Sequence, residues 1–189
     1  MGLEGSTPFR ATMCGFTRSR LDFCDPSAPA VTTCLLQSCC FTYRSAMISI
    51  RPMTTEDIQP SRELLSQLGY PLGSKELRRR YDSVMGTADH ALLVAEDEGD
   101  IIALCHVYAR PALDKPPEAV VQALVVNQAY RGRGVGRDMM MAAETWAGDH
   151  GFTSVALYSN ALRSDAHAFY ETIGYRLTAT SHLFRKSLE

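Results

Sequence analysis

The chain has 189 residues, of which 46% are apolar and 21% are charged. This composition excludes a disordered or collagen-like protein and indicates a globular one, with one domain plus an appendage. The 19 Lys and Arg residues against 21 Asp and Glu leave a formal charge of −2, which argues against a protein that binds nucleic acid through bulk positive charge.

Neither a membrane-spanning helix nor a secretory signal is visible in the sequence. No apolar run reaches the roughly 18 residues that a spanning helix needs, and the longest candidate, 101–109, is interrupted by His106. Residues 1–30 lack the basic start and the apolar stretch of a cleaved signal. We therefore expect a protein without membrane association and with a cytoplasmic location.

The cysteines are placed unevenly, because five of the six precede residue 46 and only Cys105 follows it. A zinc site needs paired ligands such as C-x-x-C or a nearby histidine pair, and neither spacing occurs. Disulfide frameworks are typical of secreted proteins, so unspecific thiols are the favoured interpretation. We expect no metal site.

The chain divides near residue 46. Residues 1–46 mix Ser, Thr, Pro, Cys and Gly without a helical or strand period, which predicts an irregular or flexible N-terminal extension. The sequence leaves three origins open for it: an artefact of the translation start, a cloning feature or a native extension. Met47 is a second candidate start, and residues 47–189 have the size of one compact domain.

A short strand, two helices and a β-hairpin are predicted in the first half of this domain. Thr54, followed three residues later by Asp57, resembles a capping box at the start of the first helix. Pro60 interrupts or restarts that helix, because proline lacks an N–H and clashes with the preceding turn. The predicted ranges are 48–50, 58–68, 74–85, 91–95 and 101–109, the last two joined by an acidic turn.

The second half begins with the β-branched run Ala119–Val126, which is typical of a strand buried on both faces. A helix is predicted from about Gly134 until Gly151 stops it. The remaining predicted elements are a strand at 154–158, a helix at 164–173 and two final strands at 175–177 and 182–184. This order predicts a mixed α/β domain with one main core.

The segment Arg131–Arg137 reads Arg-Gly-Arg-Gly-Val-Gly-Arg and lies between a predicted buried strand and a predicted helix. Glycines let a ligand approach the backbone, and the N–H groups at a helix N-terminus attract anions. The spacing fits neither the dinucleotide fingerprint nor the nucleotide-triphosphate loop. We expect a phosphate-bearing ligand here, and the alternative is a glycine-rich turn with solvated arginines.

The pattern Arg131-x-x-Gly134-x-Gly136 resembles the (Gln/Arg)-x-x-Gly-x-(Gly/Ala) signature of the GNAT superfamily of N-acetyltransferases. A second block of that family is similar to Ser159-Asn160, Ala168-Phe169-Tyr170 and Gly174-Tyr175. The resemblance covers residues 47–189. It implies a GNAT-like α/β fold, with a central mixed, mostly antiparallel sheet splayed between strands 4 and 5 and with four flanking helices.

The resemblance also implies acetyl-CoA as co-substrate. In the family, amides of the loop hold the pyrophosphate, a strand edge pairs with the pantetheine arm, and a tyrosine protonates the departing thiolate. By position that catalytic tyrosine is Tyr170. The residues so assigned to the cofactor are Leu124, Val125, Val126, Arg131, Gly132, Arg133, Gly134, Val135, Gly136, Arg137, Asn160 and Tyr170.

The implied reaction is direct attack of a neutral amine on the thioester, whose carbonyl is polarised by an N–H near Val126. Many relatives carry a carboxylate in the fourth strand where this chain has Gln122, and an amide cannot act as a base. Glu118, His106 and His167 are each as compatible with a solvated or packed side chain. We leave the base unassigned and favour water-mediated proton transfer.

The acceptor is a primary amine of a small molecule or a peptide, and the sequence does not decide between them. The expected walls of its site are the loop 68–71, which contains Tyr70, and the loop 110–117. Arg78–Arg80 has the appearance of a binding patch, although a solvated helix turn is the commoner case. A homodimer stays open. The competing function is a catalytically silent GNAT domain that senses acetyl-CoA.

Because residues 1–46 lack any period that would bury them, we expect the chain begun at Met47 to fold, to bind acetyl-CoA and to melt within a few degrees of the full-length chain. Thermal unfolding and calorimetric titration of both chains measure this. Loss of soluble protein on truncation would make the extension structural.

Overall fold

The computed structural model describes residues 48–188, and the expectations for residues 1–46 lie outside this range. Five strands form one sheet in the order β1-β2-β3-β4-β5, with antiparallel pairing except between β4 and β5, which run parallel. The strands are β1 (Ser49–Pro52), β2 (His90–Asp97), β3 (Asp100–Arg110), β4 (Glu118–Val126) and β5 (Val155–Leu157).

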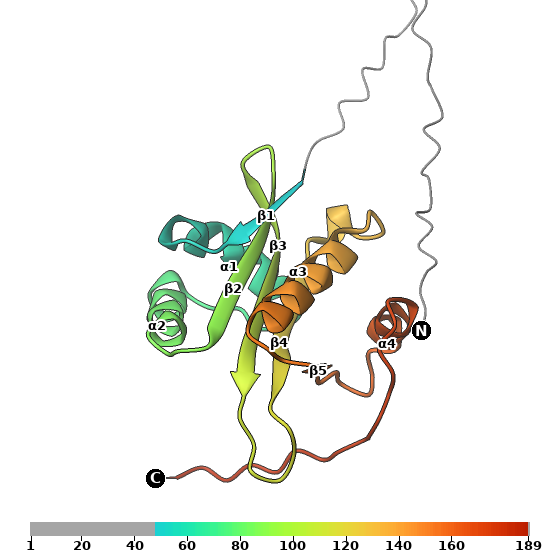
Figure 1. Cartoon of the computed structure of the whole chain (residues 1–189). Helices are drawn as coiled ribbons and strands as arrows, with labels where there is room; N and C mark the ends of the chain where they lie inside the picture. The colour runs from blue at the N-terminus through green and yellow to red at the C-terminus, as the bar shows by residue number, and fades with distance from the viewer. Residues whose placement is uncertain (1–47, 189) are drawn as a thin grey trace, which may run out of the picture. The chain divides into compact units, whose positions relative to one another are not determined.

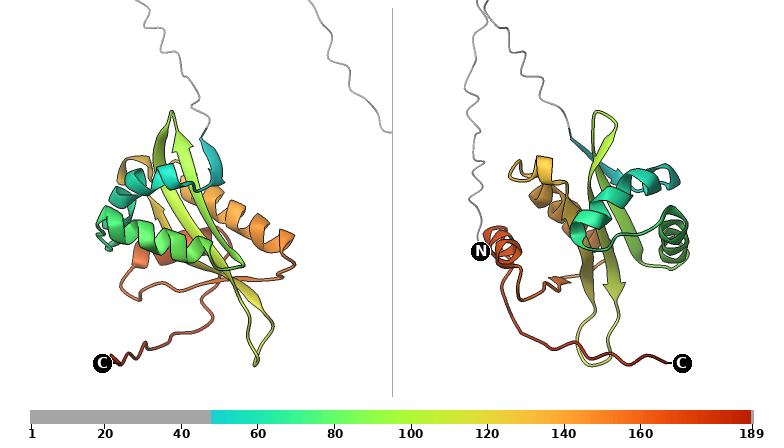
Figure 2. Two further views of the ribbon diagram at one scale, coloured as in Figure 1. Left: turned by 90° about the vertical axis from the view of Figure 1, so that its left-hand side faces the viewer. Right: turned by 180° about the vertical axis from the view of Figure 1, so that it is seen from behind.

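Helices cover both faces of this sheet (Figures 1 and 2). On one face, α1 (Ile58–Leu68) and α2 (Ser74–Met85) bury Leu64 and Leu77 against the strands. On the other, α3 (Val135–Asp149) buries Met139 and Met140. The helix α4 (Ser164–Thr172) follows β5, and short 3₁₀ turns precede α1 and α3. The mixed, mostly antiparallel sheet with four helices confirms the predicted fold class.

The predicted capping box forms at the entrance to α1. The Asp57 carboxylate accepts the Thr54 backbone N–H at 2.7 Å, and the Arg51 guanidinium binds both of its oxygens. These bonds lower the pKa of Asp57 to about 2. The hydrogen bond from Arg51 is the largest cause, and burial acts in the opposite direction. Pro60 lies in the first turn of α1, where a missing N–H costs no helical bond, so the helix is not interrupted.

Gly69 ends α1 with φ +101°, a left-handed conformation that favours glycine. The N–H of Gly69 bonds to Ser66 and that of Tyr70 to Leu65, at 3.0 and 2.8 Å. The turn closes the helix and leaves the Tyr70 side chain 62% exposed. The expected loop between the first two helices is thus fixed by its backbone.

Strand β4 carries a bulge. Its residues 123–126 pair with β3 in one register and its residues 118–121 in another, so that Gln122 has no partner on β3. A bulge adds a residue, bends the strand and increases its local twist. The side chain of Gln122 is exposed at this bend.

The pairing of β4 with β5 ends early. Only Ala119–Val121 pair with Val155–Leu157, and the five residues of β4 that follow have no partner on that side among residues 48–188. The expected splay between strands 4 and 5 is therefore present. Beyond Val121, the edge of β4 that faces away from β3 is therefore unpaired within residues 48–188, and we call it the free edge of β4.

The two final strands predicted at 175–177 and 182–184 are wrong, because residues 173–188 contain no strand. A strand needs a partner edge and a buried face. Here Leu177, Leu183 and Phe184 are 79%, 76% and 89% exposed, and β5 offers an edge of only three residues. Apolar and aromatic residues in these two short segments therefore did not suffice to predict strands. None of the helices at 48–188 is long and apolar enough to span a membrane.

Two glycines of α3 differ in what a side chain would meet. At Gly136 an added Cβ would lie 3.2 Å from Cζ of Phe169, whereas at Gly148 nothing lies within 4 Å. We expect Gly148→Ala to raise the free energy of unfolding by about 0.5–1 kcal/mol, through the lower entropy of alanine. Gly136→Ala should instead lower it by about 1 kcal/mol, because the Phe169 ring must shift.

Urea unfolding of the two variants beside the parent chain measures both values. An equal gain in both variants would show that α3 does not pack tightly on α4.

Candidate active site

A cavity of about 210 Å³ opens where β4 and β5 separate. It is bounded by the end of α1, the bulge of β4, the end of β5 and the start of α4. The cavity brings Leu124 of the predicted cofactor strand together with Asn160 and Tyr170 of the second predicted block, whereas no residue of the loop 131–137 lines it. The lining residues are Leu68, Tyr70, Val121, Gln122, Ala123, Leu124, Leu157, Tyr158, Ser159, Asn160, Arg163, Ala166 and Tyr170.

The free edge of β4 presents backbone groups to this opening. Asn127 donates its N–H to Ile102 on β3 at 2.8 Å. Because successive residues of a strand direct their backbone groups to alternate sides, those of Val126 and Leu124 face away from β3 and those of Val125 face it. Val125 instead buries its side chain in the core under α1. Leu124 and Val126 therefore carry the groups that an extended, amide-containing ligand could pair with.

The predicted phosphate loop lies at the N-terminus of α3. Gly134 is the residue before the helix, with φ +88°, and Gly132 has φ +75°. The first N–H groups of a helix have no partner within it, and no side chain caps them here. An added Cβ at Gly132 or Gly134 meets nothing within 4 Å. The loop thus has the open backbone that an anion site at a helix N-terminus needs, and Val135 can contribute only backbone because its side chain is buried.

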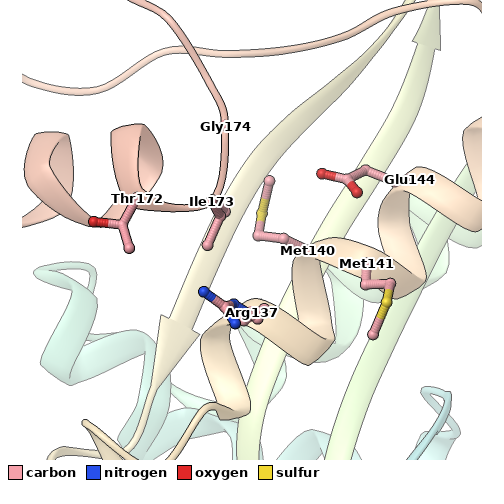
Figure 3. Close-up of a pocket in the computed structure, with 7 residues that line it drawn as sticks. All are labelled: Arg137, Met140, Met141, Glu144, Thr172, Ile173 and Gly174. Atoms are coloured by element: carbon pink, nitrogen blue, oxygen red, sulfur yellow. The ribbon is translucent and has the colours of Figure 1, made fainter.

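The three arginines of the loop have different surroundings. Arg131 donates from Nε to the Val126 carbonyl at 3.1 Å, which ties the loop to the end of β4. The Arg133 guanidinium lies 5.0 Å from the centre of the Tyr130 ring. Arg137 points into a larger, open hollow of about 450 Å³ between α3 and the end of α4 (Figure 3).

This larger hollow lacks the features of a reaction site. Its walls are Arg137, Met140, Met141, Glu144 and the residues Thr172–Gly174 (Figure 3). It contains neither Tyr170 nor the free edge of β4. The smaller cavity is therefore the candidate site.

Tyr170 reaches the cavity from α4. Its ring packs against Phe169 and Tyr175, with centroids 5.2 and 6.1 Å away. Burial raises the pKa of its phenol, and nearby Cys105 raises it further while Arg163 opposes the shift. The hydroxyl therefore carries its proton at neutral pH, as a proton donor must.

Asn160 organises the loop between β5 and α4. Its side-chain oxygen accepts the Leu162 N–H at 2.9 Å. Its carbonyl accepts the Arg163 N–H at 2.9 Å and lies 3.0 Å from Nε2 of His167. His167 thus fixes this loop as a hydrogen-bond donor, which agrees with its structural interpretation and not with a role as base.

The other base candidates are also unsuited. Burial, together with the charge of His90, lowers the pKa of His106 to about 4, so its imidazole holds a proton weakly. Its Nε2 atom lies 3.0 Å from Nδ1 of His90. Glu118 forms ion pairs with Lys115 and Arg110, which lower its pKa. Gln122 lies at the bulge in the cavity wall.

Residues 78–80 do not form a free basic patch. Arg79 and Arg80 both pair with Glu76 one turn earlier, and Arg78 pairs with Asp82, at 2.7 to 2.9 Å. These pairs lie within one helix, as in an ordinary solvated face. The cavity wall also includes two residues that sequence reasoning missed, Tyr158 and Arg163.

Comparison with known families agrees with this geometry. Residues 54–175 match the model of the acetyltransferase (GNAT) family. The chain belongs to this family. The match spans β2 to β5, the loop at α3 and the cavity between β4 and β5; β1 precedes it, and it stops where the exposed C-terminal residues begin.

Two relatives illustrate the likeness in sequence. The chain is 29% identical over 142 residues to YhdJ of Bacillus subtilis (strain 168), an uncharacterised N-acetyltransferase, an alignment that covers 74% of this chain and 99% of YhdJ. It is 28% identical over 109 residues to mouse N-acetyltransferase 8, which covers 56% of this chain and 46% of that protein.

Solved structures show the same fold at lower identity. Aminoglycoside N-acetyltransferase AAC(6')-Iy, in complex with CoA, has a TM-score of 0.71 at 19% identity and covers 77% of this chain and 99% of its own. The 6'-N-acetyltransferase AAC(6')-Ig from Acinetobacter haemolyticus has a TM-score of 0.67 at 19% identity and covers 75% of this chain and 99% of its own.

Proposed function

We propose that this protein is an N-acetyltransferase that moves the acetyl group of acetyl-CoA to a primary amine by direct attack. One observation carries the proposal: the unpaired edge of β4 and Tyr170 share one cavity, and Arg131 ties the loop at the N-terminus of α3 to the end of that same edge. A bound thioester would supply the activated acetyl group. The cradle and the edge fit the two chemically different parts of that co-substrate.

Different residues would bind the different parts of acetyl-CoA. The amides of Gly134–Arg137 and the charges of Arg131 and Arg133 would hold the pyrophosphate, because a helix N-terminus and guanidinium groups favour anions. The backbone of Leu124 and Val126 would pair with the amides of the pantetheine arm. CoA is also the ligand in the crystals of the aminoglycoside acetyltransferase.

The protein then supplies orientation and a proton. The amine nitrogen forms a bond to the acetyl carbon, the carbon–sulfur bond breaks, and the thiolate takes its proton from Tyr170. The Val126 N–H faces the open edge and would polarise the carbonyl oxygen. The acceptor's own proton leaves to water, because no carboxylate lines the cavity.

A second function is a domain that binds acetyl-CoA as a sensor without turnover. The observation that favours it is the presence of Gln122 in the cavity wall, with no carboxylate beside it. Thiol release from acetyl-CoA across a panel of amines separates the two, since the sensor binds without release.

The first test concerns the loop. Gly134→Glu places a negative charge in the cradle, so we expect the affinity for acetyl-CoA to fall by well over tenfold, about 1.4 kcal/mol or more, in calorimetric titration. Gly134→Ala carries the same backbone strain without the charge and is the matched control. Its effect, and that of Arg133→Ala, should be smaller. Equal losses for Glu and Ala would leave strain as the cause and remove the cradle.

The second test isolates the Tyr170 hydroxyl. We expect Tyr170→Phe to lower kcat by roughly 100-fold or more, the usual scale for loss of a general acid, with little change in acetyl-CoA affinity. Steady-state kinetics at saturating acetyl-CoA measures this.

Tyr175→Phe is the control for this test. Its hydroxyl belongs to the same aromatic cluster but donates to Glu144 at 2.8 Å, outside the cavity. Turnover within about threefold of the parent for Tyr170→Phe would make Tyr170 a packing residue and water the proton donor.

A further inference from the structure

The cavity carries an unusual charge for a site that takes an amine. Among the residues that line it there is one charged side chain, Arg163, and neither Asp nor Glu. Glu118, at the start of β4, forms ion pairs with Arg110 and Lys115. The net charge of the side chains that line the cavity is therefore positive.

Arg163 forms one hydrogen bond across the cavity and has further N–H donors available for a ligand. Its Nη2 donates to the carbonyl of Leu68, at the end of α1, at 2.8 Å. A guanidinium has five N–H donors in a fixed fork. Within residues 48–188 no carboxylate forms an ion pair with it. Its charge reaches the reaction centre, since it opposes the rise in the pKa of Tyr170 that burial causes.

Two aromatic side chains also line the cavity. Tyr70 and Tyr158 are 62% and 67% exposed and both line the cavity. The hydroxyl of Tyr158 accepts a hydrogen bond from Arg110, which also binds Glu118 and thereby has its charge offset. Leu68 and Leu157 complete an apolar surface.

Resting on the proposed acetyl transfer, we infer that the acceptor is a primary amine with a carboxylate beside it, of the class of α-amino acids with an apolar or aromatic side chain, and that Arg163 binds this carboxylate. A guanidinium and a carboxylate form a bidentate, charge-assisted pair. The tyrosines would contact the side chain. A polycation would bring further positive charges to a cavity that offers them no carboxylate.

The same charge assists the reaction. A cation near the acceptor lowers the pKa of its ammonium group, so a larger fraction is neutral and able to attack. The ammonium group loses one proton to water, and the neutral nitrogen bonds to the acetyl carbon as the carbon–sulfur bond breaks. The nitrogen then loses a second proton to water, and the thiolate takes a proton from Tyr170, whose phenolate regains one from water. The products are an N-acetyl amino acid and CoA, and no further reactant is needed.

Two acceptors that differ only in the carboxylate test this inference. L-Phenylalanine and phenethylamine share the ring and the amine. We expect the full-length chain to use L-phenylalanine with a kcat/KM at least about tenfold higher, the value of one good charge-assisted contact, and to use kanamycin and spermidine poorly.

Variants of Arg163 separate its charge from its link to α1. Arg163→Gln keeps an N–H donor for Leu68 and removes the charge, so the ratio of kcat/KM between the two acceptors should fall about tenfold. Arg163→Lys keeps the charge and should keep most of the ratio. Arg62→Ala is the control, because Arg62 also donates to a backbone carbonyl of this region, that of Leu72 at 3.1 Å, but does not line the cavity.

Binding gives a readout that does not depend on turnover. L-Phenylalanine and phenethylamine are titrated into the protein saturated with CoA, and tighter binding of L-phenylalanine that Arg163→Gln abolishes supports the inference. Binding of this kind without thiol release from acetyl-CoA would overturn the proposed transfer and leave the carboxylate site standing. Preferred acetylation of kanamycin or spermidine, or an unchanged acceptor ratio in Arg163→Gln, would overturn the inference and leave the transfer standing.

Discussion

The early end of the pairing between β4 and β5 is the constraint on which the site depends. Three residue pairs hold the two strands together, and beyond Val121 they separate. A strand that loses its neighbour keeps N–H and C=O groups that must find other partners. In β4, the N–H and C=O groups beyond Val121 on this side face the cavity and not a neighbouring strand within residues 48–188. The opening is wide enough for a ligand because α4 begins on its far side.

Several local features maintain this separation. The bulge at Gln122 bends β4 where the pairing stops, and β5 is too short to follow it. The link from Arg163 to the Leu68 carbonyl joins α4 to α1 across the opening. At the other end, Arg131 bonds to Val126 and fixes the loop to the same strand. The first of these links joins residues 95 apart in the sequence, and the second joins residues five apart.

Local sequence signals predicted most of the fold and half of the site. The capping box at Thr54 and the glycine loop before α3 depend on neighbours within a few residues, so their patterns are readable. The absent final strands show the limit, because Leu183 and Phe184 are apolar but find no surface to cover. Arg163 was missed for a related reason: its importance arises from a contact 95 residues away.

The free edge of β4 also exposes the protein to unwanted strand pairing with other chains. An unpaired strand edge is a template for any extended chain, and proteins commonly protect such edges from aggregation. In this fold the bulge, the overhanging Tyr70 and the cationic Arg163 make the edge difficult for another protein's strand to approach. A narrow, flexible arm can still enter. The features that shape the pocket for a small ligand therefore also hinder strand pairing at this edge.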